Sequence, residues 1–289
     1  MNLHCGQFTL DLSSPRVMGI LNVTPDSFSD GGSYSQTDLA FAQANKLIEE
    51  GADILDVGGE STRPNAQPVS LQEELDRVIP VIESLVSKVN IPISIDTYKP
   101  AVMRAAIAAG ASIVNDVKAL QEAGAIEAVA GTEVGVCLMH MQGEPQNMQD
   151  DPHYDDVVKN VVTFLLERVA ICEQEGIQKN RLLIDPGFGF GKTRAHNITL
   201  IQQLNTLATT GYPVLVGLSR KSLLGEMTGN DIDARLYASV SAAVVSAING
   251  AKILRVHDVK ATVEALKVVA AILPKDDSVV GANNSLEVK

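Results

Sequence analysis

The chain has 289 residues, of which 45% are hydrophobic and 20% charged, so it is long enough to bury a large core. Its formal net charge of −12 at pH 7 argues against nucleic acid or an anionic membrane as a partner, because both require a basic surface. No segment approaches the ~18 uninterrupted apolar residues of a membrane-spanning helix, and no basic region followed by an apolar one opens the chain.

Eight short apolar segments recur along the chain, each followed by polar residues and then by a stretch with helical periodicity. Predicted as buried parallel strands, these segments cover residues 17–21, 52–57, 91–95, 111–114, 134–139, 182–184, 214–216 and 251–254. Helical patterns follow, for example over residues 39–50, 71–89, 100–109 and 237–249. Eight such units predict a single (β/α)8 barrel, which typically takes ~250 residues.

An open doubly wound sheet is the alternative to a barrel, but no Gly-x-Gly-x-x-Gly follows the first strand.

The ends of the chain differ from these repeating units. Residues 3–12 alternate in polarity around a turn, which predicts a short hairpin that plugs the bottom of the barrel. The apolar pattern stops after Leu273, which predicts one domain over residues 1–274 and a disordered tail over residues 275–289.

The cysteine pattern bears on the compartment. Cys5, Cys137 and Cys172 are odd in number and far apart, and Cys137 falls in a predicted buried strand. Reduced thiols are therefore favoured over disulfides. This pattern predicts a cytoplasmic protein.

The loop after the second strand has the composition of a phosphate site. Gly58 and Gly59 allow the backbone to turn sharply where the strand ends. Thr62 then offers a hydroxyl and Arg63 a planar fork of donors, and Pro64 stiffens the exit. The loop suits a phosphate or pyrophosphate; an ordinary surface loop with an incidental arginine is the alternative.

Cationic side chains also follow several other predicted strands. Five cationic residues lie in this position: Arg63, Arg220, Lys221, Arg255 and His257. All strands of a barrel end at one face, where the catalytic groups of this fold lie. Ordinary helix-flanking charges explain one or two of these cations but not their repeated position. In an acidic protein, such a cluster indicates a small anionic ligand.

A second group of strand-end residues is acidic or carries an amide. Its members are Asp56, Asp96, Asn115, Asp116 and Asp185. Their acceptor atoms suit either a flat heterocycle rich in N–H donors or a divalent metal. The absence of His-x-His and Glu-x-x-His spacing argues against a tight metal cage built from protein ligands alone. For Asp56 and Asp116, a helix cap or an ion pair is an equally good interpretation.

Two further loops carry glycines. Residues 186–193 look like a phosphate-binding P-loop, but Pro186 stands where the first glycine of that motif is required. The glycines predict a close approach to a ligand plane, with Phe188 or Phe190 stacking on a ring and the other packing into the barrel rim. The long polar loop over residues 24–32, with Phe28 as its only large apolar residue, has the composition of a mobile lid.

These segments together resemble the dihydropteroate synthase family, in its bacterial form. The matching motifs occur in order and span residues 18–32, 56–64, 95–97, 115–116, 138–143, 185–192, 219–222 and 255–258. The resemblance covers about residues 3 to 272. It implies the condensation of 6-hydroxymethyl-7,8-dihydropterin pyrophosphate with p-aminobenzoate, which releases pyrophosphate and gives 7,8-dihydropteroate for folate synthesis.

The resemblance also implies roles for individual residues. Pterin binding falls to Asp96, Asn115, Met139, Asp185, Phe190, Lys221 and Arg255. Pyrophosphate binding falls to Thr62, Arg63, Arg255 and His257, with Mg²⁺ bridging the phosphates to Asn22. The p-aminobenzoate side is matched by Phe28, Pro64 and Ser222. The catalytic positions are matched by Asp96, Lys221 and Arg63. The family's usual homodimer is implied in the same way.

Two rival interpretations remain open. A methyltetrahydrofolate methyltransferase shares an acidic pterin pocket but has no use for a pyrophosphate site, so Arg63 and His257 count against it. A non-catalytic pterin-binding paralogue would be expected to lose lid or pyrophosphate residues, and none is missing here.

Overall fold

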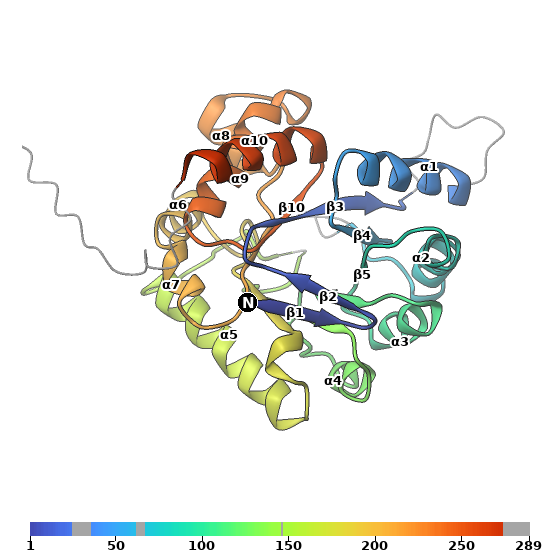
Figure 1. Cartoon of the computed structure of the whole chain (residues 1–289). Coiled ribbons are helices and arrows are strands. Elements are labelled where there is room, and N and C mark those ends of the chain that lie inside the picture. The colour runs from blue at the N-terminus through green and yellow to red at the C-terminus, as the bar shows by residue number, and fades with distance from the viewer. Residues whose placement is uncertain (25–35, 62–66, 146, 274–289) are drawn as a thin grey trace, which may run out of the picture.

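The structure is a computed structural model that describes residues 1–24, 36–61, 67–145 and 147–273. These residues form a barrel of parallel strands with helices around its outside (Figure 1). The strands are β3 (Arg16–Asn22), β4 (Ile54–Gly58), β5 (Ile93–Asp96), β6 (Ile113–Asp116), β7 (Gly135–Met139), β8 (Leu182–Asp185), β9 (Leu215–Val216) and β10 (Ile253–Val256). Their order is β8-β7-β6-β5-β4-β3-β10-β9. A parallel bridge between Ile184 and Val214 closes the ring, and confirms the predicted (β/α)8 barrel.

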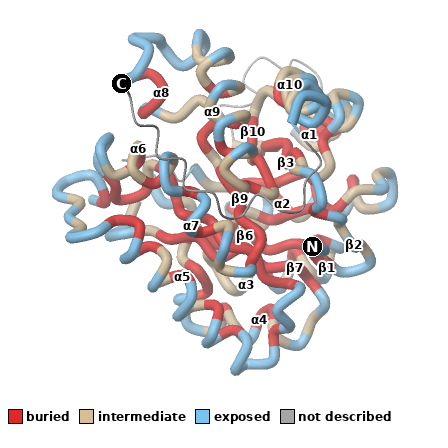
Figure 2. The backbone as a smooth tube through the Cα atoms, turned by 60° about the vertical axis from the view of Figure 1, so that its left-hand side comes forward, coloured by how far each residue is buried: buried red, intermediate tan, exposed pale blue. Residues whose placement is uncertain are grey.

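Helices follow the strands along the described part of the chain. They are α1 (Gln36–Glu49), α2 (Leu71–Val86), α3 (Pro100–Ala109), α4 (Ala125–Ala130), α5 (Val157–Gln174), α6 (Arg194–Gln202), α7 (Leu204–Ala208), α8 (Ser222–Thr228), α9 (Leu236–Ile248) and α10 (Val259–Ile272). Buried residues concentrate in the strands and on the inner sides of these helices (Figure 2). None of the described helices is long and apolar enough to cross a membrane.

The strands are apolar in sequence because both of their faces are covered. Outward side chains such as Val57, Ile95 and Leu138 pack against the helices in the main core. Inward side chains near the strand starts, such as Met18, Ile54 and Leu183, form a second apolar cluster inside the barrel. The bottom half of the barrel is therefore a solid core rather than a channel.

The predicted N-terminal hairpin is confirmed and covers this inner core. Strands β1 (Asn2–Cys5) and β2 (Phe8–Asp11) pair in antiparallel fashion across one end of the barrel (Figure 1). Leu3, Cys5 and Leu12 are fully buried in the same apolar cluster as the inner strand residues. The hairpin is anchored where Gly6 donates its N–H to the carbonyl of Glu133, at 2.7 Å.

Several strands extend further than their apolar segments predict. Asp96, Asp116, Asp185 and Arg255 were placed just past the strands, but each lies within a strand. For Asp96, Asp185 and Arg255 the reason is that the upper half of the barrel interior is polar, so a charged side chain ends the apolar pattern without ending the strand. Asp116 instead accepts backbone N–H groups of the loop after β6. The polar upper half of the barrel interior is the candidate site. Residues 275–289, for which a disordered tail is predicted, lie outside the described residues.

Candidate active site

An ion-paired cluster fills the upper barrel interior. Arg255 on β10 donates through Nε to Asp56 Oδ2 on β4 at 2.6 Å. Its Nη2 donates to Asp96 Oδ2 on β5 at 2.7 Å. Asn115 on β6 donates its side-chain N–H to the same oxygen of Asp56 at 3.3 Å. Four strands thus bring together four of the residues expected at one face of the barrel.

The cluster carries more acceptors than the protein satisfies. Oδ1 of Asp56 and Oδ1 of Asp96 are buried and accept no hydrogen bond within the described part of the chain. Burial raises the pKa of Asp96 to about 7, against the opposing effect of Arg255, and the neighbouring Asp56, Glu74 and Asp116 raise it further. Buried acceptors normally have partners. The arrangement therefore suits a ligand that presents N–H donors.

Asp185 and Lys221 form the opposite side of the site. Asp185 on β8 accepts the N–H of Gly187 at 2.7 Å. Burial raises its pKa, with Lys221 the largest opposing influence. Lys221, which precedes α8, donates from Nζ to the carbonyl of Phe188. Burial lowers its pKa to about 8, opposed first by Asp185. The pair presents one acceptor and one donor to the interior.

An apolar patch adjoins this pair. Met139 and Phe190 are buried in a small cluster with Val117 and Met148. The Phe190 ring lies 4.7 Å from Lys221 Nζ, centroid to atom. Phe188 instead packs into the main core and is 1% exposed. Of the two phenylalanines considered for stacking, only Phe190 lies next to the site.

Two predicted phosphate-side residues line a cavity of about 470 Å³. Asn22 from β3 and His257 after β10 both contribute to its wall, between α1 and α10. The backbone N–H of His257 donates to Ser219 Oγ at 3.2 Å, and its Nδ1 lies 3.1 Å from the same oxygen. Ser222, at the start of α8, is exposed. These residues lie on the same side of the barrel as the ion-paired cluster, as predicted.

Two of the charged residues have structural partners. Arg220 lines the same cavity but pairs with Asp258 in a bidentate contact, Nε to Oδ2 at 3.0 Å and Nη2 to Oδ1 at 2.5 Å. Asp116 accepts the backbone N–H groups of Lys118 and Leu120, at 2.7 and 2.8 Å. Arg220 therefore differs from the expected ligand-binding cation, and the capping interpretation of Asp116 is confirmed. For Asp56 the ion-pair interpretation is confirmed.

Thr62, Arg63, Pro64 and Phe28 lie outside the described residues, as does most of the proposed lid over residues 24–32.

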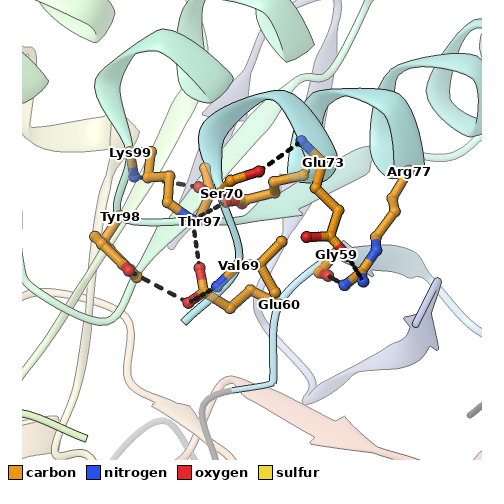
Figure 3. Close-up of polar contacts among 10 residues, drawn as sticks. Gly59, Glu60, Val69, Ser70, Glu73, Arg77, Thr97, Tyr98 and Lys99 are labelled. Atoms are coloured by element: carbon orange, nitrogen blue, oxygen red, sulfur yellow. Dashed lines mark hydrogen bonds and ion pairs between the residues drawn. The ribbon is translucent and has the colours of Figure 1, made fainter. Parts of the chain in front are cut away.

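The structure does describe the base of the 62–66 loop. Glu60 there accepts from the hydroxyl of Tyr98 at 3.3 Å and the N–H of Val69 at 3.1 Å (Figure 3). Lys99 Nζ lies 2.5 Å from Glu60 Oε2 and 2.5 Å from Glu74 Oε2. This network ties the residues that flank the loop, Glu60 and Val69, to α2 and to the start of α3.

Sequence reasoning missed this network and one more buried group. The sequence pattern did not indicate a site role for the largely or fully buried residues Lys99, Glu74, His140 and Lys192. A usable signal existed for Glu74, a carboxylate on the apolar face of an amphipathic helix. Lys192 belongs to the glycine-rich segment 186–193, which looks like a P-loop but lacks the first glycine of that motif.

Comparison with known proteins agrees with this geometry. Residues 18–257 match the family described as pterin binding enzyme. Dihydropteroate synthase of Escherichia coli K12 is 52% identical over 273 residues, covering 94% of this chain and 97% of the relative. A structure of Xanthomonas albilineans dihydropteroate synthase with 4-aminobenzoic acid superposes with a TM-score of 0.90 at 55% identity, covering 94% of this chain and 99% of the other.

A second structure of the Xanthomonas albilineans enzyme holds 7,8-dihydropteroate. It superposes with a TM-score of 0.87 at 52% identity, covering 95% of this chain and 100% of the other. The chain belongs to the pterin binding enzyme family, in the branch of the dihydropteroate synthases.

Proposed function

We infer that the protein condenses 6-hydroxymethyl-7,8-dihydropterin pyrophosphate with p-aminobenzoate, releasing pyrophosphate and giving 7,8-dihydropteroate in folate synthesis. Relatives about 50% identical over nearly the full chain are named dihydropteroate synthase, and solved structures of such relatives hold 4-aminobenzoic acid or 7,8-dihydropteroate. Within the molecule, the observation that carries the inference is the Arg255 guanidinium held between Asp56 and Asp96. The Oδ1 atom of each carboxylate accepts no hydrogen bond within the described residues.

The pterin ring matches the chemistry of the site. Its amino group and ring N–H atoms are donors, and Asp185, Asn115 and Asp96 supply acceptors for them. Lys221 donates to the ring's acceptor edge, while Arg255 lies against the ring face. Met139 and Phe190 provide the apolar wall beside it. We assign the p-aminobenzoate side to Ser222, at the start of α8, and on the family's pattern also to Phe28 and Pro64.

The reaction needs no covalent bond to the protein. The arylamine nitrogen attacks the exocyclic methylene carbon of the pterin, and the carbon–oxygen bond breaks. Pyrophosphate leaves with the bonding electrons, and the new amine loses a proton to solvent. Positive charge develops on the pterin as the bond breaks, and the carboxylate of Asp96 stabilises it. Asp185 and Lys221 hold the ring so that both reacting atoms keep their alignment.

The leaving-group side involves Asn22, His257, Arg255 and the loop residues Thr62 and Arg63. Asn22 offers an amide oxygen at the cavity wall, a hard ligand of the kind Mg²⁺ accepts. Within the described ranges, no group of three His, Cys, Asp or Glu residues forms a metal site. Asn22 therefore fits a Mg²⁺ ion held mainly by phosphate and water, which neutralises charge on the leaving group when bound.

Pyrophosphate release is the direct test of this function. Product formation should require both the pterin pyrophosphate and p-aminobenzoate. A methyltransferase would release no pyrophosphate, and a non-catalytic paralogue would bind pterin without turnover. Release that fails to appear, or that is independent of p-aminobenzoate, would contradict the proposal.

His257→Ala should distinguish the phosphate side from the pterin side. We expect it to weaken binding of the pterin pyrophosphate by roughly 10- to 150-fold, as for one lost hydrogen bond to a charged group, and to leave hydroxymethylpterin binding unchanged. Calorimetry with both ligands, with and without Mg²⁺, measures this. His153→Ala is the control, because His153 is 82% exposed in its side chain. Equal losses for both ligands would assign His257 to general support of the pocket.

The pH dependence of kcat/KM for the pterin ester should be bell-shaped, because this quantity reports the free enzyme. Asp96, with a pKa of about 7, must lose its proton to stabilise positive charge, so activity rises through pH 7. Lys221, with a pKa of about 8, must keep its proton to donate to the pterin, so activity falls above pH 8. Lys221→Met should remove the alkaline limb. A profile that is flat from pH 6 to 9 would contradict both roles.

A homodimer is proposed on the family's pattern and on an exposed apolar face. Val245 and Ile248 on α9 and Val268 and Ile272 on the adjacent α10 are all exposed. Ile248→Glu combined with Val268→Glu should yield a monomer in sedimentation velocity, whereas Leu166→Glu, at an exposed position of α5, should not. A wild-type chain that sediments as a monomer at micromolar concentration would overturn the proposal.

A cytoplasmic location is proposed on the cysteine pattern. Cys5, Cys137 and Cys172 are buried free thiols, a state that a reducing compartment maintains. Cell fractionation tests this proposal: the chain should be detected in the cytosolic fraction.

A further inference from the structure

Lys192 is a buried ammonium group beneath the pterin side of the site. It is 3% exposed. Its Nζ lies 2.9 Å from His140 Nδ1, 2.9 Å from the carbonyl of Gly187 and 2.9 Å from that of Phe190. Burial lowers the pKa of Lys192. The two carbonyls accept from Lys192, and the ammonium form donates to His140 Nδ1 as well when the ring proton is on Nε2.

His140 is suited to be such an acceptor. Burial, together with the Lys192 charge, lowers its pKa to about 3, so the ring is neutral at physiological pH. The ring packs edge-on against Phe164, with centroids 5.0 Å apart. In the tautomer with the ring proton on Nε2, Nδ1 accepts from the Lys192 ammonium group, 2.9 Å away.

The loop held by Lys192 has little freedom to take another shape. Gly187 and Gly191 have φ of 68° and 60°. A Cβ on Gly187 would lie 1.8 Å from the carbonyl oxygen of His140, and one on Gly191 would lie 2.2 Å from that of Gln142. The two glycines therefore serve loop-to-loop packing. Asn197 adds a further tie, accepting from the N–H of Gly189 at 2.8 Å.

The same loop contacts both ionic residues of the pterin side. Gly187 donates its N–H to Asp185 Oδ1 at 2.7 Å. Phe188 accepts from Lys221 Nζ, and the Phe190 ring lies beside that nitrogen. The orientation of Asp185 and of Lys221 thus depends on where residues 187–190 lie.

We propose that Lys192 is a positioning residue for the pterin site, because its buried ammonium group holds the 187–191 loop where Gly187 and Phe188 orient Asp185 and Lys221. The assignment of Asp185 and Lys221 to pterin rests on the proposed function. Lys192 also adds positive charge near Asp185, which favours the ionised carboxylate. The other groups facing Asp185 are Lys221, Arg255, the amide of Gly187 and the buried thiol of Cys137.

Lys192→Met removes both the donors and the charge, and Arg181→Met is its matched control. Arg181 is also a buried cation, 2% exposed, that donates to the carbonyls of Val134 at 2.8 Å and Val129 at 3.0 Å. It lies just before β8, at the opposite end of the barrel from the site. Both variants should unfold at lower urea concentration than the wild type, since each leaves buried carbonyls without donors.

Calorimetry with a non-phosphorylated pterin from pH 5 to 8 separates positioning from stability. We expect Lys192→Met to bind the pterin roughly 10- to 150-fold more weakly, as for one lost hydrogen bond to a charged group. The fall in pterin affinity at acidic pH, here called the acid limb, should also move to higher pH. Arg181→Met should keep the wild-type affinity and acid limb. Lys192→Gln keeps two N–H donors without the charge. It should therefore recover stability and pterin affinity, but its affinity should still be lost at a higher pH than in the wild type. This variant carries the test if Lys192→Met does not fold.

The outcomes distinguish this proposal from the function it rests on. Unchanged affinity and an unchanged acid limb in the folded Lys192 variants, with Asp185→Asn still weakening pterin binding, would overturn the positioning role alone. Unchanged pterin binding in Asp185→Asn would instead overturn the assignment of the pterin site.

Discussion

Asp185→Asn is expected to weaken binding of a pterin fragment by roughly 10- to 150-fold, equal to about 1.5–3 kcal/mol for a hydrogen bond to a charged acceptor. The amide places an N–H₂ group where the carboxylate had an acceptor, so one pterin donor is left poorly paired. Asp185 also accepts the N–H of Gly187. An amide oxygen can keep that bond, and the loss is therefore expected mainly in the ligand. Calorimetry with hydroxymethylpterin measures it.

Asp116→Asn is the control for this experiment. Asp116 is likewise a buried carboxylate at a strand end, on β6 with β7 between it and β8, and it accepts two backbone N–H groups. It contacts the loop after β6 rather than the ion-paired cluster. We expect reduced stability in Asp116→Asn with wild-type pterin affinity. Equal affinity losses in the two variants would show that any buried carboxylate near the strand ends supports the pocket, and would remove Asp185's specific role.

Arg255→Met is expected to have the largest effect on stability, about 3–5 kcal/mol at pH 8, because it leaves buried carboxylates without their cation. Asp56 is 0% and Asp96 10% exposed in their side chains, and Arg255 is the ion-pair partner of both. Pterin binding should be lost as well, since the guanidinium is placed against the ring. Urea unfolding measures the stability. Arg255→Met with Asp56→Asn should be more stable than Arg255→Met alone.

The stability deficit of Arg255→Met should shrink as the pH falls. The pKa of Asp96 is raised to about 7, so below pH 7 the folded protein binds a proton that the unfolded chain has lost above its ordinary pKa of ~3.9. Stability contributed by this group therefore falls as the pH rises from about 4 to 7. Once protonated, Asp96 needs no cation, so the deficit at pH 5 should be smaller than at pH 8.

Arg220→Met is the control for Arg255→Met. Arg220 makes a bidentate pair with Asp258, but its side chain is 35% exposed, and exposed pairs contribute only about 0–1 kcal/mol. A pH-independent loss of similar size in both variants would show that the Arg255 deficit reflects packing of the side chain rather than uncompensated charge.

The sequence by itself determined the fold and the face of the barrel that carries the site. Eight apolar segments alternating with helical patterns admit few arrangements, because each unit must cover both faces of a parallel strand. In a barrel all strand ends meet at one face, so placing Asp96, Asn115, Asp185, Lys221, Arg255 and His257 near strand ends was enough to predict their convergence. The motifs that they occupy then indicated the family.

Only the tertiary structure decided which groups pair and which remain for a ligand. Arg255 is separated by 199 residues from Asp56 and by 159 from Asp96, and no local pattern encodes a contact across such distances. The same holds for Arg220, a cation expected at a ligand that is instead paired with Asp258, and for Phe188, which packs into the core while Phe190 faces the site. Lys192 belongs to a motif that resembled a phosphate loop, and its buried acceptors come from two loops that meet only when β7 and β8 pair. Local sequence determines where a side chain lies along its strand, but the folded barrel determines its partners, because desolvation and hydrogen bonding depend on everything that surrounds it.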